Sequence, residues 1–459
     1  MDRAEVIGLG RSGIAAARLL QRNGWQVTLG DKATEERIKL RSNGRELQSA
    51  KSSLEAAGIE VKLGYTPDLN SENAPKLIVV SPGVPWDIPL LVEARRKGID
   101  TIGELELAWR YLKSVPWLGI TGTNGKTTTT ALIAAIFKAK GLNAPACGNI
   151  GYAACELALA EKTPDWVIAE ISSYQIESSA ELQPQIAIWT TLTPDHLSRH
   201  KTFANYADIK ASLLHRSSKQ ILNGNDPNLL KLDVKQWQDA YWTNINGLQK
   251  QREREVYLQD DWVVAFGELI LPISLFKMPG IHNQQNLLMA VAAARLAGIE
   301  KKAIVEAIAS FSGVPHRLEY ICTYKEVEYI NDSKATNYDA AEVGLRSVTA
   351  PVILIAGGQA KEGDDTAWIA QIKERTAAVL LIGEAAPKFA RRLQESGYEN
   401  YEIVETLENA VVGSVDLAKE KNAKVVLLSP ACASFDRYLS FEHRGEHFRQ
   451  LCQELCVKN

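Results

Sequence analysis

The sequence has few cysteines, no long apolar run and little net charge. Its 459 residues include six cysteines, and none falls in the close pairs typical of zinc sites. We therefore expect free thiols in a reducing compartment, with Cys452 and Cys456 on a packed helix face. The formal net charge of −3 and the lack of a basic stripe argue against nucleic acid as a partner.

Targeting and membrane segments are also missing from the sequence. Met1-Asp-Arg-Ala-Glu5 leads directly into the apolar pair Val6-Ile7, without a basic segment, an apolar segment or a cleavage site. No later stretch is apolar over the length that a bilayer requires. We expect a cytoplasmic chain without membrane insertion.

Apolar strand-like runs alternate with helix-like segments along the whole chain, which predicts an α/β fold with parallel sheets. The length is too great for one core and indicates about three domains. The first boundary should follow the helix Glu104–Tyr111, and the second should lie near Gly313 and Pro315. The expected domains are residues 1–113, 114–313 and 314–459.

The central region opens with a strand, a glycine turn and a helix that begins with lysine, Thr121-Gly-Thr-Asn-Gly-Lys-Thr127. Backbone N–H groups of such a turn bind phosphate oxygens, Lys126 would reach the terminal phosphates, and the Thr127 hydroxyl would bind Mg²⁺. Ile120 stands where the usual pattern has its first glycine, so the match is incomplete. The turn predicts an ATP or GTP site; an ordinary strand-to-helix turn is the alternative.

Two further polar residues follow strands of the same region. Glu170 ends the strand that begins at Trp166, and His196 follows the strand Ile186–Thr191. Carboxyl ends of parallel strands share one edge, so both side chains would join Thr127 as magnesium ligands. Either residue alone would more often be a loop or capping group. We expect His200, close by, to lie at the surface.

The chain begins with a dinucleotide-type fingerprint, Gly8-Leu-Gly10-Arg-Ser-Gly13, and a second strand ends in Asp31. Taken alone, this pattern fits a nicotinamide dehydrogenase, a protein for another nucleotide diphosphate, or a purely structural turn. The phosphate loop that follows argues against a dehydrogenase. Ser81 follows another strand and should face the same crevice.

Three strands of the last region, Val327–Ile330, Val352–Ala356 and Val425–Leu428, each end in a polar cluster. Ligands of open α/β sheets bind at such ends. A substrate with two carboxylates needs cations, hydroxyls and N–H groups from separate loops, and these clusters supply them. Any one lysine taken alone would be a solvated loop end. The clusters and the residue that follows them contain Lys334, Thr336, Lys361, Ser434 and Phe441.

One further pattern, His443-Arg-Gly-Glu446-His447, literally matches an inverted zinc-protease motif. It contains a glycine, adjoins a terminal helix and has no evident third ligand. Packing or a helix surface explains it better than a metal site.

Taken together, the motifs resemble those of the Mur ligase family, ATP-dependent amide ligases, over essentially the whole chain. The last two of the motifs below separate the branch that adds D-glutamate from its siblings. The residues that carry the resemblance are Thr121-Gly-Thr-Asn-Gly-Lys-Thr127, Gly148-Asn-Ile-Gly151, Glu170-Ile-Ser-Ser-Tyr-Gln-Ile-Glu177, Asp195-His-Leu197, Gly280-Ile-His-Asn283, Pro315-His-Arg317, Asn331-Asp-Ser-Lys-Ala-Thr-Asn337 and Ser429-Pro-Ala-Cys-Ala-Ser-Phe-Asp436.

The resemblance implies a Rossmann-like N-terminal domain for a uridine nucleotide, a P-loop central domain with a mostly parallel sheet for ATP, and a Rossmann-like C-terminal domain for the incoming amino acid. For ATP it implies Gly122, Thr123, Asn124, Gly125, Lys126, Thr127, Thr128, Asn283, Asn286, Arg317 and Asp332. For the UDP-substrate the fingerprint and the resemblance together indicate Gly10, Arg11, Ser12, Asp31, Ser81, Asn149 and Gln175. For D-glutamate they indicate Lys334, Thr336, Lys361, Ser434 and Phe441.

The family also carries a carbamylated lysine that bridges to a second magnesium ion, so two Mg²⁺ ions are implied. Lys210 has the matching setting, on a helix after Asp195-His196, although Lys201 is also available. A carbamate offers the oxygen ligands that Mg²⁺ prefers. The implied metal ligands are Thr127, Glu170, His196 and Lys210 as its carbamate. The implied catalytic residues are Lys126, His196 and Lys210, with His196 or the carbamate as a conjectural general base.

The implied reaction joins D-glutamate to UDP-N-acetylmuramoyl-L-alanine through an acyl phosphate, in peptidoglycan precursor synthesis. We expect a monomer whose third domain closes over ATP. Three rivals stay open: a sibling ligase for another amino acid, a catalytically silent ATP-binding regulator, and a nicotinamide dehydrogenase.

Overall fold

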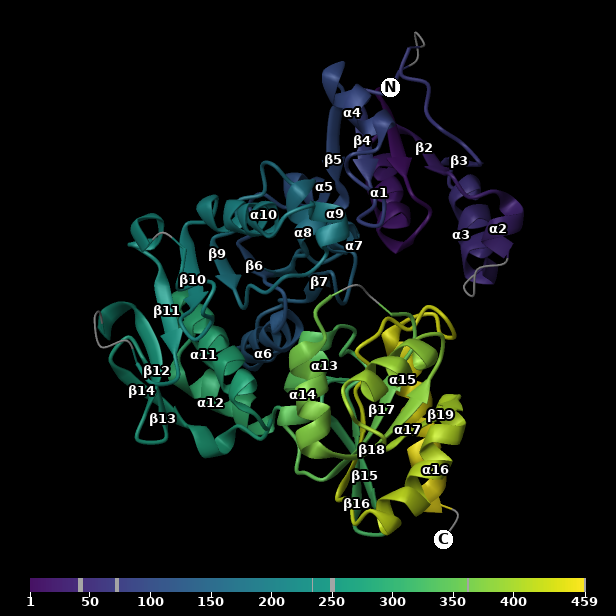
Figure 1. Ribbon diagram of the computed structural model, residues 1–459. Helices are drawn as coiled ribbons and strands as arrows, with labels where there is room; N and C mark the ends of the chain where they lie inside the picture. The colour runs from purple at the N-terminus through teal and green to yellow at the C-terminus, as the bar shows by residue number, and fades with distance from the viewer. Residues whose placement is uncertain (40–43, 71–73, 233, 248–251, 361–362, 458–459) are drawn as a thin grey trace. The chain divides into compact units, whose positions relative to one another are not determined.

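The computed structural model describes residues 1–39, 44–70, 74–232, 234–247, 252–360 and 363–457. The chain forms two compact units, Met1–Phe276 with Gln284–Phe311, and Lys277–Asn283 with Ser312–Asn459. The first unit holds two β-sheets and the second holds one (Figure 1). Each predicted domain therefore has a sheet, although the first two sheets share a unit. The boundaries after residues 113 and 313 stay predictions.

The N-terminal sheet has five parallel strands in the order β3-β2-β1-β4-β5. This is the Rossmann strand order, which reverses at β1 and places the turn after β1 at the switch point where nucleotides bind. Its elements are β1 (Arg3–Ile7), α1 (Arg11–Arg22), β2 (Gln26–Asp31), α2 (Glu35–Lys39), α3 (Gly44–Ala56), β3 (Glu60–Leu63), β4 (Leu77–Val80), α4 (Pro89–Arg96), β5 (Asp100–Gly103) and α5 (Glu104–Tyr111).

The central sheet has nine strands in the order β14-β13-β12-β11-β10-β9-β6-β8-β7. Its strands pair in parallel except at β12–β13 and β13–β14, which are antiparallel. Strand β6 is wholly buried and lies between β8 and β9, so the loops after these three strands meet at one edge.

The strands of this region are β6 (Trp117–Thr121), β7 (Ala146–Gly148), β8 (Val167–Glu170), β9 (Ile186–Trp189), β10 (Lys219–Asn223), β11 (Tyr241–Asn244), β12 (Glu255–Gln259), β13 (Trp262–Ala265) and β14 (Glu268–Pro272). Its α-helices are α6 (Lys126–Ala139), α7 (Ala154–Leu159), α8 (Ser173–Glu177), α9 (Leu197–His200), α10 (Phe203–His215), α11 (Ile281–Leu296) and α12 (Lys301–Ser310). Short 3₁₀ helices cover Val234–Trp237, Arg252–Arg254 and Ile273–Leu275.

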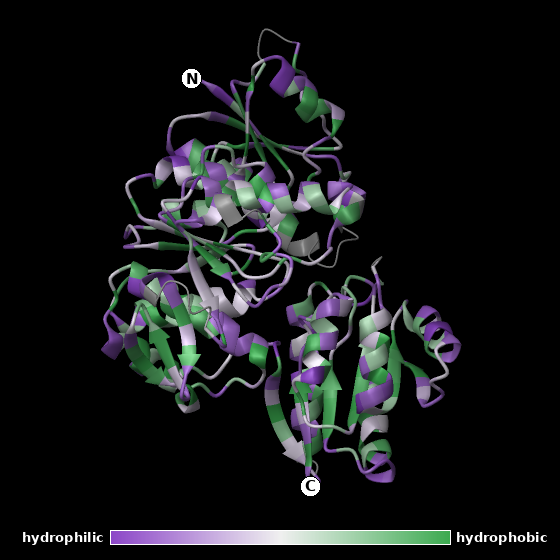
Figure 2. Cartoon of the chain, turned by 60° about the vertical axis from the view of Figure 1, so that its left-hand side comes forward, coloured by the Kyte–Doolittle hydropathy of each residue, from purple (hydrophilic) through white to green (hydrophobic). Residues whose placement is uncertain are grey.

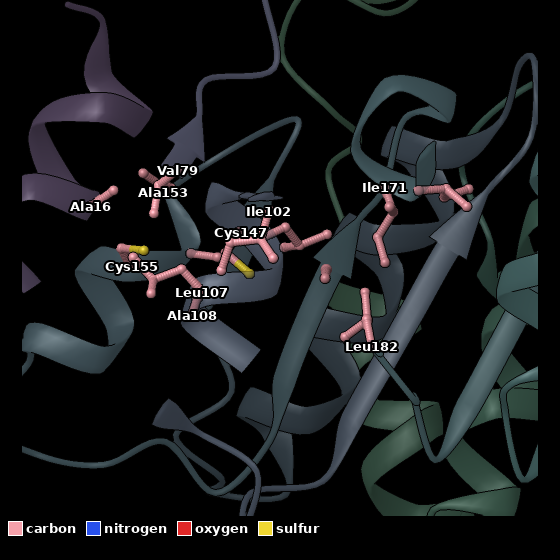
Figure 3. Close-up of a cluster of buried hydrophobic side chains, with 14 of the residues drawn as sticks. Ala16, Val79, Ile102, Leu107, Ala108, Cys147, Ala153, Cys155, Ile171 and Leu182 are labelled. Carbon is pink, nitrogen blue, oxygen red and sulfur yellow. The ribbon is translucent and has the colours of Figure 1, made fainter. Parts of the chain in front are cut away.

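The N-terminal and central sheets share an apolar core within the first unit. Figure 3 shows Ala16 of α1, Leu107 of α5 and Cys155 of α7 in one buried cluster. Both Cys147 and Cys155 in this cluster are free thiols. The shared core places the glycine turn after β1 and the phosphate loop after β6 in the same compact unit.

The third sheet, in the second unit, has the order β15-β16-β20-β17-β18-β19, and only the β15–β16 pairing is antiparallel. Its layering is Rossmann-like, although its strand order differs from that of the N-terminal sheet. Its elements are β15 (Glu319–Tyr324), β16 (Val327–Asn331), α13 (Tyr338–Arg346), β17 (Val352–Gly357), α14 (Thr366–Arg375), β18 (Thr376–Ile382), α15 (Ala386–Glu395), β19 (Tyr401–Glu405), α16 (Leu407–Glu420), β20 (Val425–Leu428) and α17 (Phe441–Val457).

Successive side chains of a strand point to opposite faces of this sheet, which explains why helices cover both faces. On β17, Val352 and Leu354 pack in the cluster with α13, α14 and α15, whereas Ile353 and Ile355 pack in the cluster with α16 and α17. Figure 2 shows the resulting hydrophobic strands between helices that carry hydrophilic outer residues. Among the described residues, no helix combines the length and apolar character that a bilayer span needs.

Candidate active site

The loop between β6 and α6 requires glycine at two positions. Gly122 has φ +145° and Gly125 has φ +84°, conformations that side chains rarely adopt. A Cβ at Gly122 would lie 2.0 Å from Thr190 Oγ1, and a Cβ at Gly125 would lie 2.6 Å from Asn286 Oδ1. The loop is therefore pressed against the end of β9 and against α11.

Polar contacts from the segment after β9 hold the rest of this loop. The Thr123 hydroxyl accepts from the Thr193 backbone N–H at 3.0 Å and lies 3.1 Å from the Tyr206 hydroxyl. The Asn124 N–H donates to Thr191 Oγ1 at 2.8 Å. These contacts fix the backbone conformation of the loop before any ligand binds, as a phosphate-binding turn needs.

Two lysines converge on one carbonyl of the loop. Lys126 Nζ donates to the Gly122 and Thr123 carbonyl oxygens at 2.9 and 2.8 Å. Lys210 Nζ, from α10, donates to the Gly122 carbonyl oxygen at 3.0 Å and to Thr121 Oγ1 at 3.3 Å. Lys210 is only 1% exposed, and burial, followed by the charge of Lys126, lowers its pKa well below 10.5. Lys201, the alternative, is exposed.

Glu170 and Thr127 form the oxygen-rich part of the site. The Glu170 carboxylate is buried; its Oε2 accepts from Thr127 Oγ1 and its Oε1 from Asn149 Nδ2, both at 2.8 Å. A carboxylate beside a hydroxyl fits the hard-oxygen preference of Mg²⁺. Within the described ranges, no three or more His, Cys, Asp and Glu side chains are grouped as a metal site. Of the predicted metal ligands, Thr127 and Glu170 are hydrogen-bonded to each other.

His196 lies at the N-cap of α9 with a left-handed backbone, φ +55°. Its Nδ1 lies 3.1 Å from the Tyr174 hydroxyl, and its Nε2 lies 3.5 Å from Asp195 Oδ2. The side chain is 37% exposed, so solvent or a substrate can reach the ring.

The prediction that His200 lies at the surface was wrong. His200 is 1% exposed, and its Nε2 lies 2.8 Å from the Ser173 hydroxyl. Its ring packs between Tyr174 and Tyr206, with both centroids 5.4 Å away, and burial lowers its pKa to about 4. Helix α9 is a single turn, and a positive φ at Lys201 redirects the chain after it. No apolar periodicity in the sequence signals that turn.

The tilted rings of Tyr174, His200 and Tyr206 connect two predicted parts of the site, the loop that holds His196 and the phosphate loop. Tyr174 contacts His196, whereas Tyr206 contacts Thr123 of the phosphate loop. The sequence does not predict the contacts of Ser173, His200 and Tyr206, because only the folded chain brings these residues together.

Asp31 and Ser81 shape the glycine turn of the N-terminal sheet. The Asp31 carboxylate accepts from the Leu9 and Ala33 N–H groups at 2.9 and 2.8 Å, and the Ser81 hydroxyl donates to the Gly8 carbonyl oxygen at 3.1 Å. Ser81 therefore contacts the glycine turn after β1, and a UDP-substrate crevice at this place stays a prediction. Gly10, Arg11 and Ser12 follow as the N-cap and first two residues of α1.

The remaining pair predicted for the UDP-substrate lies in the central domain. Asn149 is exposed and reaches Glu170. Gln175 is buried, and its Oε1 accepts from the Ser172 N–H at 3.0 Å and from the Ser172 hydroxyl at 2.9 Å. Gln175 therefore forms the capping box of α8 with Ser172, the N-cap residue.

The residues predicted near adenine and ribose fall in both compact units. Asn286, in the first unit, accepts from Thr129 Oγ1 at 3.3 Å. In the second unit, Asn283 Nδ2 donates to the Pro279 carbonyl oxygen at 2.7 Å. Thr128 on α6 is fully buried, away from direct solvent. Asn286 and Thr128 are therefore held by contacts within the first unit, and Asn283 by a contact within the second unit.

Asp332 of the second unit is buried, and its carboxylate accepts from the Ser429 hydroxyl at 2.9 Å and from the Leu318 N–H at 3.3 Å. Burial raises its pKa to about 7, with Arg317 opposing the shift. Arg317 Nε is buried and has no hydrogen-bond partner within the described part of the chain. A donor of this kind is suited to an incoming phosphate or ribose oxygen.

The loops predicted for D-glutamate meet at the carboxyl edge of the third sheet. Lys334 follows β16, and its Nζ lies 4.8 Å from the centroid of the Phe441 ring at the start of α17. Ser434 follows β20 and is 2% exposed, and the Thr336 N–H donates to the Lys334 carbonyl oxygen. Lys361 lies outside the described residues.

The zinc-protease-like pattern lies on α17, and its side chains have separate partners. His443 Nδ1 accepts from the Leu439 N–H at 3.4 Å, and His447 Nδ1 lies 2.9 Å from the Tyr438 hydroxyl. Glu446 pairs with Arg449. These contacts fit the helix-surface interpretation.

Comparisons with known proteins give the family. The sequence model of the Mur ligase middle domain matches residues 120–294, and that of the Mur ligase MurD-like N-terminal domain matches residues 2–103. UDP-N-acetylmuramoylalanine--D-glutamate ligase from Microcystis aeruginosa is 68% identical over 99% of this chain and 100% of its own length. The chain belongs to the Mur ligase family. The ligase of the same name from Synechocystis sp. is 64% identical to this Mur ligase over 98% of the chain and 99% of its own.

A solved structure agrees with the fold of this Mur ligase. UDP-N-acetylmuramate-alanine ligase from Thermotoga maritima superposes with a TM-score of 0.59 at 18% identity, over 99% of this chain and 100% of its own. The predicted α/β class with three such domains is confirmed.

Replacing Gly122 by alanine should weaken ATP binding about tenfold or more. The added Cβ would meet Thr190 Oγ1 at 2.0 Å, and the required φ of +145° costs a side chain about 1–3 kcal/mol, so the loop must move. Calorimetric titration with Mg-ATP measures the change. Gly141→Ala is the matched control, because Gly141 also has a positive φ, +83°, but open space around its Cβ. Unchanged affinity in Gly122→Ala would contradict this loop's role.

Proposed function

We propose that this Mur ligase joins D-glutamate to UDP-N-acetylmuramoyl-L-alanine, consuming ATP and forming ADP and phosphate, in peptidoglycan precursor synthesis. The full-length identity of 68% to a ligase of that name carries the proposal. The phosphate loop with Lys126 and the polar loops of the third sheet supply the two chemistries that such a reaction needs.

The reaction proceeds in two steps. A carboxylate oxygen of the L-alanyl group attacks the γ-phosphorus of ATP, ADP leaves, and an acyl phosphate forms. The amine of D-glutamate then attacks the acyl carbon, the C–O bond to phosphate breaks, and an amine proton passes to a base. His196, with its exposed ring, and the carbamate on Lys210 are the two candidates for that base.

The chain's own residues position these reactants. Lys126 starts from the carbonyls of its own loop and turns to the β- and γ-phosphates, where its charge stabilises the transferring group. Gly122–Thr128 form the cradle, in which the N–H groups of Thr123 and Asn124 donate to Thr191 and the other N–H groups face the phosphates in this proposal. Asn283, Asn286, Arg317 and Asp332 are the further nucleotide contacts. Magnesium, when bound, offsets phosphate charge during transfer. We assign two ions to Thr127, Glu170, His196 and the carbamate of Lys210.

The substrate sites follow the predicted residues. Gly10, Arg11, Ser12, Asp31, Ser81, Asn149 and Gln175 serve the UDP-substrate in this proposal. Lys334, Thr336, Lys361, Ser434 and Phe441 serve D-glutamate, whose two carboxylates suit cations and hydroxyls from separate loops. We further propose that the chain acts in the cytoplasm, because ATP and the nucleotide substrate are found there. We also propose that it is a monomer, which size-exclusion chromatography tests.

Phosphate release by the purified chain tests the function. With Mg-ATP and UDP-N-acetylmuramoyl-L-alanine present, D-glutamate, L-glutamate, L-alanine and a diamino acid are added in turn. Release that depends on D-glutamate is the expected result. Release with another amino acid would make the chain a sibling ligase, and release with none would leave an ATP-binding protein without ligase activity.

A further inference from the structure

Arg444, in the first turn of α17, is a buried cation that forms no hydrogen bond to a carboxylate within the described part of the chain. It is 1% exposed, and it lies within the second compact unit. None of the groups that accept from its guanidinium is an acid: the acceptors are one hydroxyl and four backbone carbonyls. Burial disfavours this charge, and the charge of Asp436 offsets the burial only in part, so the hydrogen bonds of the guanidinium must account for much of its presence.

Those hydrogen bonds reach the loops after three different strands. Arg444 Nε and Nη2 donate to the hydroxyl and the carbonyl oxygen of Ser333, at 3.0 and 2.8 Å, in the loop after β16. Nη2 and Nη1 donate to the carbonyls of Cys432 and Ala433, at 3.1 and 3.3 Å, in the loop after β20. Nη1 also reaches the Gly357 carbonyl at the end of β17, at 3.5 Å, the longest of the set.

The acceptors of Ser333, Cys432 and Ala433 lie next to, or in the same loop as, a residue assigned above to D-glutamate. Ser333 precedes Lys334, Ala433 precedes Ser434, and Gly357 is the last residue of β17. The Ser333 hydroxyl in turn donates to the Phe441 carbonyl oxygen at 2.8 Å. One side chain thus connects the loops that carry Lys334 and Ser434, and through Ser333 the start of α17, which carries Phe441.

The loops around Arg444 are packed so closely that a different side chain at this position could not easily restore their arrangement. A Cβ at Gly358 would lie 2.4 Å from the Ala433 carbonyl oxygen and 3.0 Å from Arg444 Nη1. The Gln359 and Ala433 backbones also pair with each other at 2.8 and 3.1 Å. A planar guanidinium can donate in several fixed directions at once, whereas an ammonium is a single point on a flexible stem.

We propose that Arg444 is a positioning residue for D-glutamate: its guanidinium fixes the relative placement of the loops after β16, β17 and β20, and so sets affinity for the amino acid. This inference rests on the proposed function. The side chain acts through the loops that it holds, so a change at Arg444 should alter D-glutamate binding more than the binding of ATP or of the UDP-substrate.

The test compares Arg444→Lys and Arg444→Met with Arg375→Lys and Arg375→Met. Arg375 is a matched control, because it also binds backbone carbonyls of the second unit, those of Leu345 and Val348 at 3.1 and 2.7 Å. Those carbonyls lie ahead of β17, at the amino edge of the sheet, away from the D-glutamate loops. Steady-state phosphate release gives KM for each of the three substrates and kcat.

Both Arg444 variants should raise the KM for D-glutamate roughly ten- to hundredfold, because small misplacements of binding groups have effects of that size. KM for the UDP-substrate should stay within about twofold, as should all three constants in the Arg375 variants. KM for ATP should rise less than KM for D-glutamate, because Asp332 is the one proposed nucleotide contact in the loop after β16. Unchanged KM for D-glutamate in both Arg444 variants would overturn the proposal, and so would an equal rise for all three substrates.

Amide hydrogen exchange separates this inference from the function itself, since it needs no activity. In Arg444→Lys, exchange should quicken in residues 331–337, 357–360 and 429–434 and stay unchanged in the rest of the second unit. Exchange that is faster by the same factor throughout the second unit, or that is no faster than in wild type, would contradict the positioning role. A wild-type chain without D-glutamate-dependent release would instead refute the proposed function, and the exchange result would still decide whether Arg444 holds the loops.

Discussion

Lys126→Ala should lower ligation by roughly 10³-fold or more while the fold persists. Lys126 is the first residue of α6 and directly follows the phosphate loop. The loop residues before it, Thr121–Gly125, carry no charged side chain. Removing a cation that stabilises a transferring phosphoryl group raises the barrier by about 4 kcal/mol, which corresponds to that factor. Phosphate release with D-glutamate present measures the loss, and circular dichroism checks the fold.

Lys138→Ala is the matched control for this variant. Lys138 lies on the same helix but is exposed in its last turn, so it should leave the rate unchanged. Full activity in Lys126→Ala would remove the phosphate assignment of the loop. Equal losses in both variants would point to damage of α6 instead of a role in phosphoryl transfer.

Much of the fold could be predicted because its signals are local. Strand β20 is Val425–Leu428 and α5 is Glu104–Tyr111, as their apolar patterns predict. Strand β9 ends earlier than predicted, at Trp189, because Thr190 and Thr191 turn to the phosphate loop and hydrogen-bond to it. The apolar pattern alone predicts a β9 that continues to Thr191, and the contacts of these two threonines with the phosphate loop make the strand shorter.

The phosphate loop was also predictable, since its glycines and its Lys-Thr pair lie within seven consecutive residues. His200 and Arg444 were not, because their environments come from distant segments. Arg444 binds Ser333, which lies 111 positions earlier, and His200 binds Ser173, which lies 27 positions earlier. No local pattern distinguishes a buried arginine from a solvated one. Arg444 even lies inside a motif that first suggested zinc.

The burial of Lys210 favours the carbamate proposed above. Carbon dioxide reacts with the neutral amine, and burial beside Lys126 shifts the pKa of Lys210 well below 10.5. The neutral form is therefore populated at lower pH than in an exposed lysine. A carbamate retains a single N–H, so it can keep at most one of the present contacts to Gly122 and Thr121, while its oxygens become available as metal ligands.

Lys210→Arg should therefore lower ligation by roughly 10²-fold or more, because arginine keeps the charge but is always protonated and cannot form a carbamate. Lys201→Arg is the matched control, since Lys201 is the other nearby lysine and is exposed. Phosphate release gives the rate, and a ¹³C NMR spectrum with ¹³C-bicarbonate should show a carbamate resonance in wild type and in Lys201→Arg but not in Lys210→Arg. A resonance that disappears only with Lys201 would move the modification there. Full activity in Lys210→Arg would show that ligation needs no carbamate at this position.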